Sequence, residues 1–146
     1  MARYLLGVNF QGGVVDAPME EWKPEEITAH LDYYAALHDE LVDSGELVGS
    51  DVLTGPDLAK VVTSDGSGLF VVDGPFQEFK EWLAGYQIVE VESEERALEI
   101  AARLSAVPGP DGVPTQQPIH VRRIMDDGPS GTDEMREYLE TAGGER

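Results

Sequence analysis

Two segments with helical periodicity alternate with short apolar runs along this chain, and this alternation restricts the fold more than any other feature. The first helix begins at Pro24, where a proline and two following glutamates suit a helix N-terminus, and it ends at Gly45. The second begins after Ser93, a good N-cap residue. The predicted buried stripe of the first helix, with spacings of four and three, is Ile27, Leu31, Tyr34, His38 and Leu41. That of the second is Ala97, Ile100, Ala101 and Leu104.

The other apolar runs are short enough to be strands. They cover residues 4–8, 46–49, 58–63, 69–72, 86–91 and 119–125. Between the third and fourth runs lies Ser64-Asp65-Gly66-Ser67-Gly68, which predicts a hairpin. Two helices that are each followed by a strand predict an α+β fold, a ferredoxin-like antiparallel sheet with the helices on one face. The other face of such a sheet needs a cover, so we expect a homodimer.

Composition narrows the classes of function. The 146 residues suffice for one domain, which we expect to span residues 1–125, and the acidic segment 126–146 is expected to be a mobile tail. No apolar run approaches the roughly 18 residues that cross a membrane, and the N-terminus lacks a signal peptide's apolar stretch, so we expect a cytoplasmic protein. The absence of cysteine excludes disulfides, thiolate nucleophiles and cysteine-ligated zinc.

Charge restricts the expected partners. The chain carries 29 acidic and 10 basic residues, a formal net charge of -19. Phosphate groups would be repelled, so neither nucleic acid nor an anionic membrane is an expected partner. Two interpretations of the negative charge stay open. Either the charge attracts a basic partner, or the acidic residues form a solvated surface that keeps the protein soluble.

The stretch Asp73-Gly74-Pro75-Phe76 separates two predicted strands. Pro75 has no N–H to donate to a sheet, so the strand must end there and the chain must turn. The role of Asp73 can then be interpreted in two ways. Either its carboxylate accepts hydrogen bonds from backbone N–H groups of the turn, or it is a catalytic carboxylate.

His38 is the second candidate for acid/base chemistry, because the predicted stripe turns its imidazole toward the sheet. It is either a core histidine bonded to a backbone carbonyl or tyrosine, or a pocket acid/base with Tyr34 one helical turn earlier. The histidine spacing fits no metal motif, and the glycine pairs fit no dinucleotide or P-loop pattern. We therefore expect neither a metal nor a cofactor.

The stretch DGPFQEFKEWLAGY resembles the signature of the DGPF proteins, a branch of the YCII-related superfamily. The resemblance extends over about residues 1–125, although Phe79 and Arg123 stand where the family often has Thr and Pro. It implies a dimeric α+β barrel in which two ferredoxin-like sheets enclose the interface. It also implies a likeness to cofactor-free lactone isomerases and monooxygenases with a pocket between sheet and helices, and a genetic link to extracytoplasmic-function sigma factors.

We therefore expect a small-molecule-binding homodimer. The more specific hypothesis is a cofactor-independent enzyme in which His38 and Asp73 transfer protons on a carbonyl-containing compound. The expected pocket residues are Tyr34, Pro75, Phe76 and Tyr86. The alternative is a regulatory interaction protein whose acidic helix and tail bind a partner such as a sigma factor. A third hypothesis is a fold kept for structure alone. The residues name no substrate, and they leave open whether there is catalysis.

Overall fold

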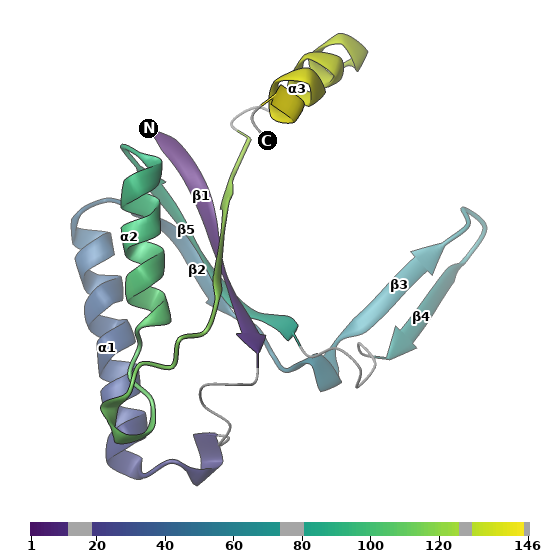
Figure 1. Cartoon of the computed structure of the whole chain (residues 1–146). Helices are drawn as coiled ribbons and strands as arrows, with labels where there is room; N and C mark the ends of the chain where they lie inside the picture. Colours follow the sequence, from purple (N-terminus) through teal and green to yellow (C-terminus); the bar gives the residue numbers. More distant parts are fainter. Residues whose placement is uncertain (12–18, 74–80, 126–129, 145–146) are drawn as a thin grey trace.

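The computed structural model describes residues 1–11, 19–73, 81–125 and 130–144, and its centre is a four-stranded antiparallel sheet (Figure 1). The strand order is β2-β5-β1-β6. The strands are β1 Ala2–Gln11, β2 Leu47–Val52, β5 Glu81–Val91 and β6 Ile119–Arg123. With one helix after β1 and another after β5, this is the order of a ferredoxin-like α+β fold, as the sequence predicts.

Both long helices cover one face of this sheet (Figure 1). They are α1 Pro24–Asp43 and α2 Glu94–Ser105. Their ends follow local chemistry. Ser93 caps α2 by accepting a hydrogen bond of 3.2 Å from the Arg96 N–H, and Gly45 follows α1 with a φ of 79° that favours glycine. The tyrosine hydroxyl of Tyr33 donates to the Arg103 carbonyl over 2.7 Å, so the two helices are also bonded to each other.

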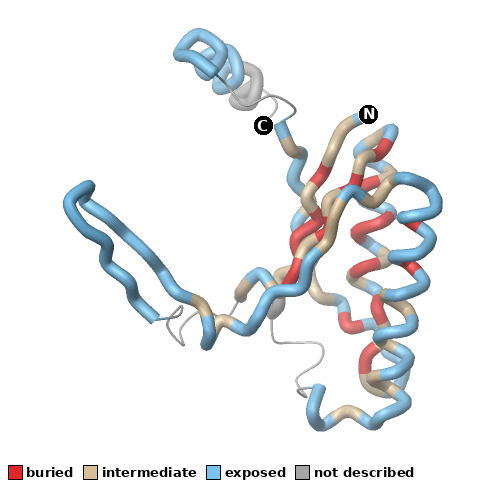
Figure 2. Tube along the Cα trace, turned by 180° about the vertical axis from the view of Figure 1, so that it is seen from behind, coloured by how far each residue is buried: buried red, intermediate tan, exposed pale blue. Residues whose placement is uncertain are grey.

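The core lies between the helices and the central strands (Figure 2). Its fully buried aliphatic side chains are Leu6, Leu37, Leu41, Val89, Val91, Ile100 and Leu104. The stripe predicted for α2 is confirmed. The one predicted for α1 is partly wrong, because Leu37 is buried while His38 is exposed and Leu31 is 56% exposed. The buried face of α1 follows residues 27, 30, 34, 37 and 41 instead, which also have helical spacing.

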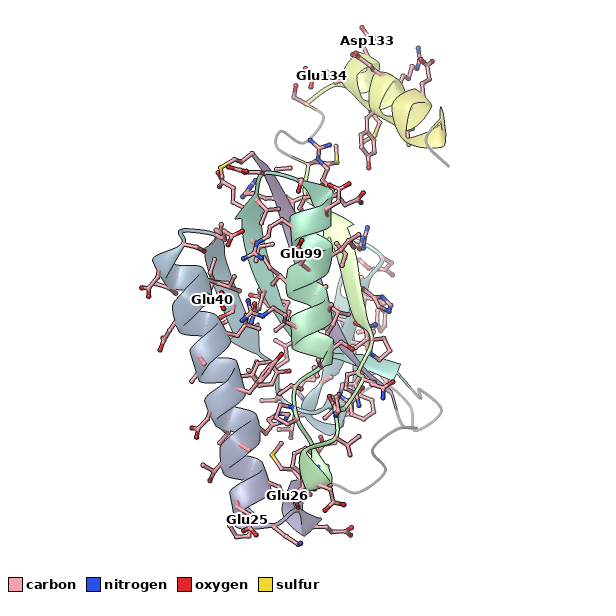
Figure 3. All side chains as sticks on the ribbon, turned by 60° about the vertical axis from the view of Figure 1, so that its left-hand side comes forward. Glu25, Glu26, Glu40, Glu99, Asp133 and Glu134 are labelled. Atoms are coloured by element: carbon pink, nitrogen blue, oxygen red, sulfur yellow. The ribbon has the colours of Figure 1, made fainter. Side chains whose placement is uncertain are left out.

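No helix among the described residues covers the second face of the sheet, which we call the open face. Side chains alternate between the faces of a strand, so the neighbours of the buried core residues point to this side. The open face carries Arg3, Leu5, Asp51, Tyr86, Ile88, Glu90, His120 and Arg122. Leu5 pairs with Ile88 at its centre, and the two arginines balance the two carboxylates. Figure 3 shows other acidic side chains on the helices, among them Glu25, Glu40 and Glu99.

A second sheet consists of the hairpin β3 Lys60–Ser64 and β4 Leu69–Asp73, which we call the arm, residues 60–73. It confirms the predicted hairpin, with Gly66 at a φ of 94° in the turn and the Ser67 N–H bonded to Asp65 over 2.9 Å. All its residues are exposed, and it projects away from the main sheet (Figures 1 and 2).

The acidic C-terminal segment, which was expected to be a tail, contains a helix, α3 Thr132–Gly144. Its described side chains are exposed, and it lies beyond the end of β6 (Figure 1). Within the described part of the chain, no helix is both long and apolar enough to span a membrane.

One ion pair ties α2 to the beginning of β2. The Arg96 guanidinium donates to both carboxylate oxygens of Glu46, over 2.8 and 2.9 Å, and their side chains are 30% and 15% exposed. The same guanidinium bonds the more exposed Glu99, one helical turn away. The hydrogen bonds from Arg96 lower the pKa of Glu46. Paired, two-point contacts of this kind are stronger than ordinary surface ion pairs.

Glu46→Gln is expected to lower the free energy of unfolding at neutral pH by about 1–3 kcal/mol, since a charged hydrogen-bond acceptor is lost. A carboxylate with a depressed folded-state pKa stabilises above its ordinary value of about 4.3, and this stabilisation is lost as the pH falls through the lower folded value. The difference between wild type and variant should therefore shrink below about pH 4. Urea denaturation at several pH values measures it. The control Glu99→Gln should change stability by less than about 0.5 kcal/mol.

Candidate functional site

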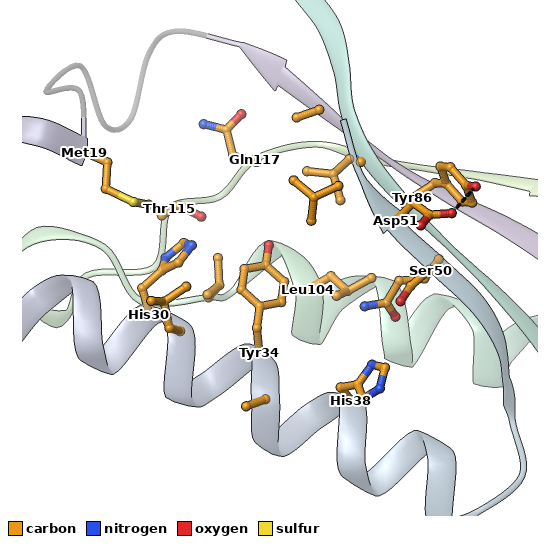
Figure 4. Close-up of a pocket in the computed structure, with 18 of the residues that line it drawn as sticks. Met19, His30, Tyr34, His38, Ser50, Asp51, Tyr86, Leu104, Thr115 and Gln117 are labelled. Atoms are coloured by element: carbon orange, nitrogen blue, oxygen red, sulfur yellow. Dashed lines mark hydrogen bonds between the residues drawn. The ribbon is translucent and has the colours of Figure 1, made fainter. Parts of the chain in front are cut away.

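A cavity of about 890 Å³ lies between α1, the sheet and the segment 107–117, on the helix-covered side (Figure 4). Its wall is mostly apolar. Residues 30–38 from the middle of α1 form one side, and the end of β2 with residues 84–87 of β5 forms another. Residues that contribute include Trp22, Leu31, Ala35, Val52, Leu104 and Val107. A volume of this size and a wall of this kind are typical of sites for small organic molecules.

His30 is the best-positioned polar group in the cavity wall. Its ring meets Trp22 edge-on at 5.3 Å between centroids and Tyr34 edge-on at 5.1 Å. Its Nδ1 lies 2.8 Å from the Pro108 carbonyl oxygen, which can only accept. Nδ1 therefore carries the proton in the neutral ring, and Nε2 is left as an acceptor. A histidine oriented by a backbone carbonyl in this way is suited to be a general base.

Tyr34 supplies a proton donor beside this base. Figure 4 shows its side chain and that of His30 rising from neighbouring turns of α1 into the same space. Burial raises the pKa of the Tyr34 phenol, and the neighbouring Tyr33 raises it further. The phenol therefore keeps its proton at neutral pH and can donate it in a hydrogen bond. Base and donor face one region of the cavity.

Gln87 is a further polar group in the wall, and it comes from the central strand β5. The residue is 9% exposed, and its Oε1 accepts no hydrogen bond within the described residues. A buried amide oxygen without a partner is costly, so a donor on a bound molecule would stabilise it. Ser50, which is paired with Gln87 across β2 and β5, lines the same part of the cavity.

Tyr86, a predicted pocket residue, borders the cavity where β2 ends, although its position in the strand register belongs to the open face. Its hydroxyl donates to Asp51 over 2.6 Å, and this hydrogen bond raises the pKa of the Tyr86 phenol (Figure 4). The pair joins neighbouring strands at the rim of the cavity. Tyr86 is therefore a rim residue, while Tyr34 lies deeper.

The structure separates the two residues predicted to share catalysis. His38 lines the cavity from α1 but is exposed. Asp73 is not among the described residues of the wall. It ends the arm, where its side chain is 88% exposed and bonded to Lys60 over 2.9 Å. Pro75 and Phe76 lie outside the described residues, and so does the turn that Asp73 was expected to cap.

Two of these groups, His30 and Gln87, are not among the site residues that the sequence predicts. The predicted stripe of α1 does not include His30, yet residues 30, 34, 37 and 41 have the same spacings of four and three. The periodicity therefore fits a stripe with His30 equally well. Gln87 stands inside an apolar strand, where a lone amide is itself a signal of a polar site. Among the described residues no three metal-ligating side chains gather.

Comparison with protein-family models places most of the chain in a known family. The family model described as the YCII-related domain matches residues 3–119, a range that includes β2, β5, α1, α2, all but the first residue of β1 and every cavity residue named above, and that ends at the first residue of β6. No curated protein matches the chain.

His30→Phe is expected to lower the free energy of unfolding by about 1–3 kcal/mol, because an aromatic ring is kept but the part-buried Pro108 carbonyl loses its donor. Urea denaturation measures the change. The matched control is His38→Phe, the same substitution at an exposed position of α1, which should stay within about 0.5 kcal/mol of wild type. Equal losses in the two variants would show that the carbonyl bond does not hold the wall in place.

Proposed function

The chain belongs to the YCII-related domain family, and on that premise we propose that it binds a small carbonyl-containing molecule between α1 and the sheet. The observation that carries this proposal is His30, fixed by the Pro108 carbonyl with its Nε2 free as an acceptor in a largely apolar cavity. The aromatic and aliphatic side chains of the wall favour an apolar ligand body. The few polar groups of the wall favour a ligand that has one hydrogen-bond acceptor and one acidic group or hydrogen-bond donor.

We further propose that the bound molecule undergoes proton transfer. His30 Nε2 removes a proton from the carbon beside the carbonyl, while the Tyr34 hydroxyl donates a hydrogen bond to the carbonyl oxygen on which negative charge develops. The imidazolium then returns its proton to the same carbon or to a neighbouring one. This sequence moves only protons and needs no cofactor. The ring distance of 5.1 Å between His30 and Tyr34 lets both contact one small ligand.

The predicted pair of His38 and Asp73 stays a separate proposal. His38 reaches the cavity rim from α1, but Asp73 lies on the arm. A pair between them requires the arm to take another position or to come from a second chain. In the proton-transfer scheme above, His38 is therefore a second group at the rim rather than the base.

The test is exchange of α-protons in D₂O with a panel of cyclic ketones and lactones, read by mass spectrometry. Wild type should exchange them, and His30→Gln should slow exchange by about 100-fold or more, the usual effect of losing a general base. The control Glu99→Gln lies on the exposed side of α2, outside both the cavity wall and the open face, and should leave the rate unchanged. Native mass spectrometry of the same samples reports binding.

Three outcomes are informative. Binding together with exchange that depends on His30 supports both steps. Binding without exchange contradicts the proton transfer and leaves a binding protein. If no member of a broad panel binds and the purified protein carries no ligand, the binding proposal is wrong.

We also propose that the protein is a homodimer that pairs its open faces. A chain with a formal charge of -19 repels its own copies over most of its surface. The open face is the exception, because Arg3 and Arg122 balance Asp51 and Glu90 around the apolar pair of Leu5 and Ile88. Pairing two such faces would cover the second side of each sheet.

Light scattering at micromolar concentration should therefore give the mass of two chains. Leu5→Glu places a charge at the centre of the open face and should shift the population toward monomers. A monomeric wild type at this concentration would contradict the proposal.

A regulatory interaction protein is the second candidate function, and α3 favours it. This helix carries an exposed apolar stripe that consists of Met135, Tyr138 and Leu139. Most of the charged residues of the helix are acidic. A stripe bordered by carboxylates suits a partner with a basic rim, and the resemblance to DGPF proteins suggests a sigma factor. A cavity that binds no ligand would favour this function over the first.

A further inference from the structure

The arm exposes more apolar surface than an isolated hairpin can hold in water. Its strand pairing places Val61, Phe70 and Val72 on one side and Val62, Leu69 and Val71 on the other. These side chains are between 47% and 70% exposed, with Leu69 the most exposed. A two-stranded hairpin is marginally stable by itself, and a contiguous apolar surface of this kind marks an interaction site.

The charge of the arm differs from that of the rest of the chain. Residues 60–73 hold one lysine and two aspartates, and Lys60 is bonded to Asp73. Apart from Asp65 in the turn, the segment between these two residues has no charged side chain. In a chain with a net charge of -19, the arm and the neutral open face are thus the surfaces that another copy can approach with little repulsion.

The base of the arm is held in place by the main sheet. The Leu53 N–H continues the pairing of β2 with β5 by bonding the Ala84 carbonyl over 2.9 Å. The short helical turn Pro56–Leu58 follows, closed by the bond from the Leu58 N–H to the Gly55 carbonyl at 3.0 Å. From there β3 runs outward on the side of the sheet that lies away from α1 and α2 (Figures 1 and 2).

We propose that the arm docks on a second copy of this chain. A copy seated on the open face lies on the side toward which the arm projects, so each arm can pack along the other chain, and a two-fold axis makes the contact reciprocal. This inference rests on the proposed homodimer and adds to it a specific contact. Docking of the arm on its own chain fits less well, because the arm points away from its own sheet (Figure 1).

Docking of the arm would also affect the cavity. Val52, Ala84 and Gly85 line the cavity and stand at the base of the arm. The strands are close together there, since a Cβ on Gly85 would lie 2.9 Å from the Asp51 carbonyl oxygen. A second chain that fixes the arm therefore also fixes this part of the rim. Dimer formation and ligand binding should then be coupled.

Substitutions on each side of the arm test the contact. Phe70→Glu and Leu69→Glu lie on opposite sides of the hairpin, and Leu98→Glu is the matched control on the exposed face of α2. All three add one negative charge and remove a half-exposed apolar side chain. We expect at least one arm variant to raise the dissociation constant of the dimer, measured by analytical ultracentrifugation, tenfold or more relative to the control. Circular dichroism checks that each variant folds.

A cross-link provides a second, independent measurement. The chain has no cysteine, so Val71→Cys and Leu98→Cys each create a single attachment point for a benzophenone label. Illumination should join two chains when the label is on the arm and should leave monomers when it is on α2. Cross-links from the arm that stay within one chain would show that it folds back, and this would overturn the inference.

The outcomes separate this inference from the homodimer itself. If wild type is monomeric at all concentrations, both proposals fail. If wild type is dimeric but both arm variants match Leu98→Glu and the arm label forms no cross-link between chains, the open faces pair without the arm and only the arm contact is wrong. A weakened arm variant together with a cross-linked dimer supports the contact.

Discussion

Packing of two helices on one face of the sheet is the interaction on which the rest of this structure depends. Leu6 and Val89 come from the two central strands and are fully buried, and Leu37 and Ile100 meet them from the two helices. Each such side chain contributes about 1.5–3 kcal/mol when buried. Both long helices are used on this side, and among the described residues none is left for the other. The one-sided core therefore determines where a cavity can form and where another molecule can dock.

The cavity results from the unequal lengths of the two helices. The helix α1 has 20 residues and α2 has 12, so the first part of α1 runs on beyond α2. The later part, with Leu37 and Leu41, closes the core. Beside the earlier part the segment 107–117 supplies the opposite wall, and the bond from His30 to Pro108 connects the two. One helix thus stabilises the fold at one end and carries the candidate chemistry at the other.

Charge distribution links this site to the surface. Acidic side chains gather on the outer faces of the helices, whereas the open face is balanced and the arm is nearly uncharged. Electrostatic repulsion between two copies of this strongly negative protein is weakest when they approach through these two regions. The arm leaves the sheet at the cavity rim, so association on that side and the shape of the site share the same residues.

Local sequence was enough for features whose partners lie within a few residues. It predicted the start of α1 at Pro24, the end at Gly45, the cap at Ser93 and the hairpin turn at Gly66, because caps and turns depend on neighbouring backbone groups. It also predicted the α+β order. Only the tertiary structure decided which of two equally spaced stripes on α1 faces inward, since this depends on where the sheet and the segment 107–117 lie. His30 is 78 residues from its partner Pro108, and Asp73 is kept from His38 by the direction of the arm. Periodicity gives the spacing of a face but not its orientation, and a cavity whose walls are distant in the chain has no local pattern.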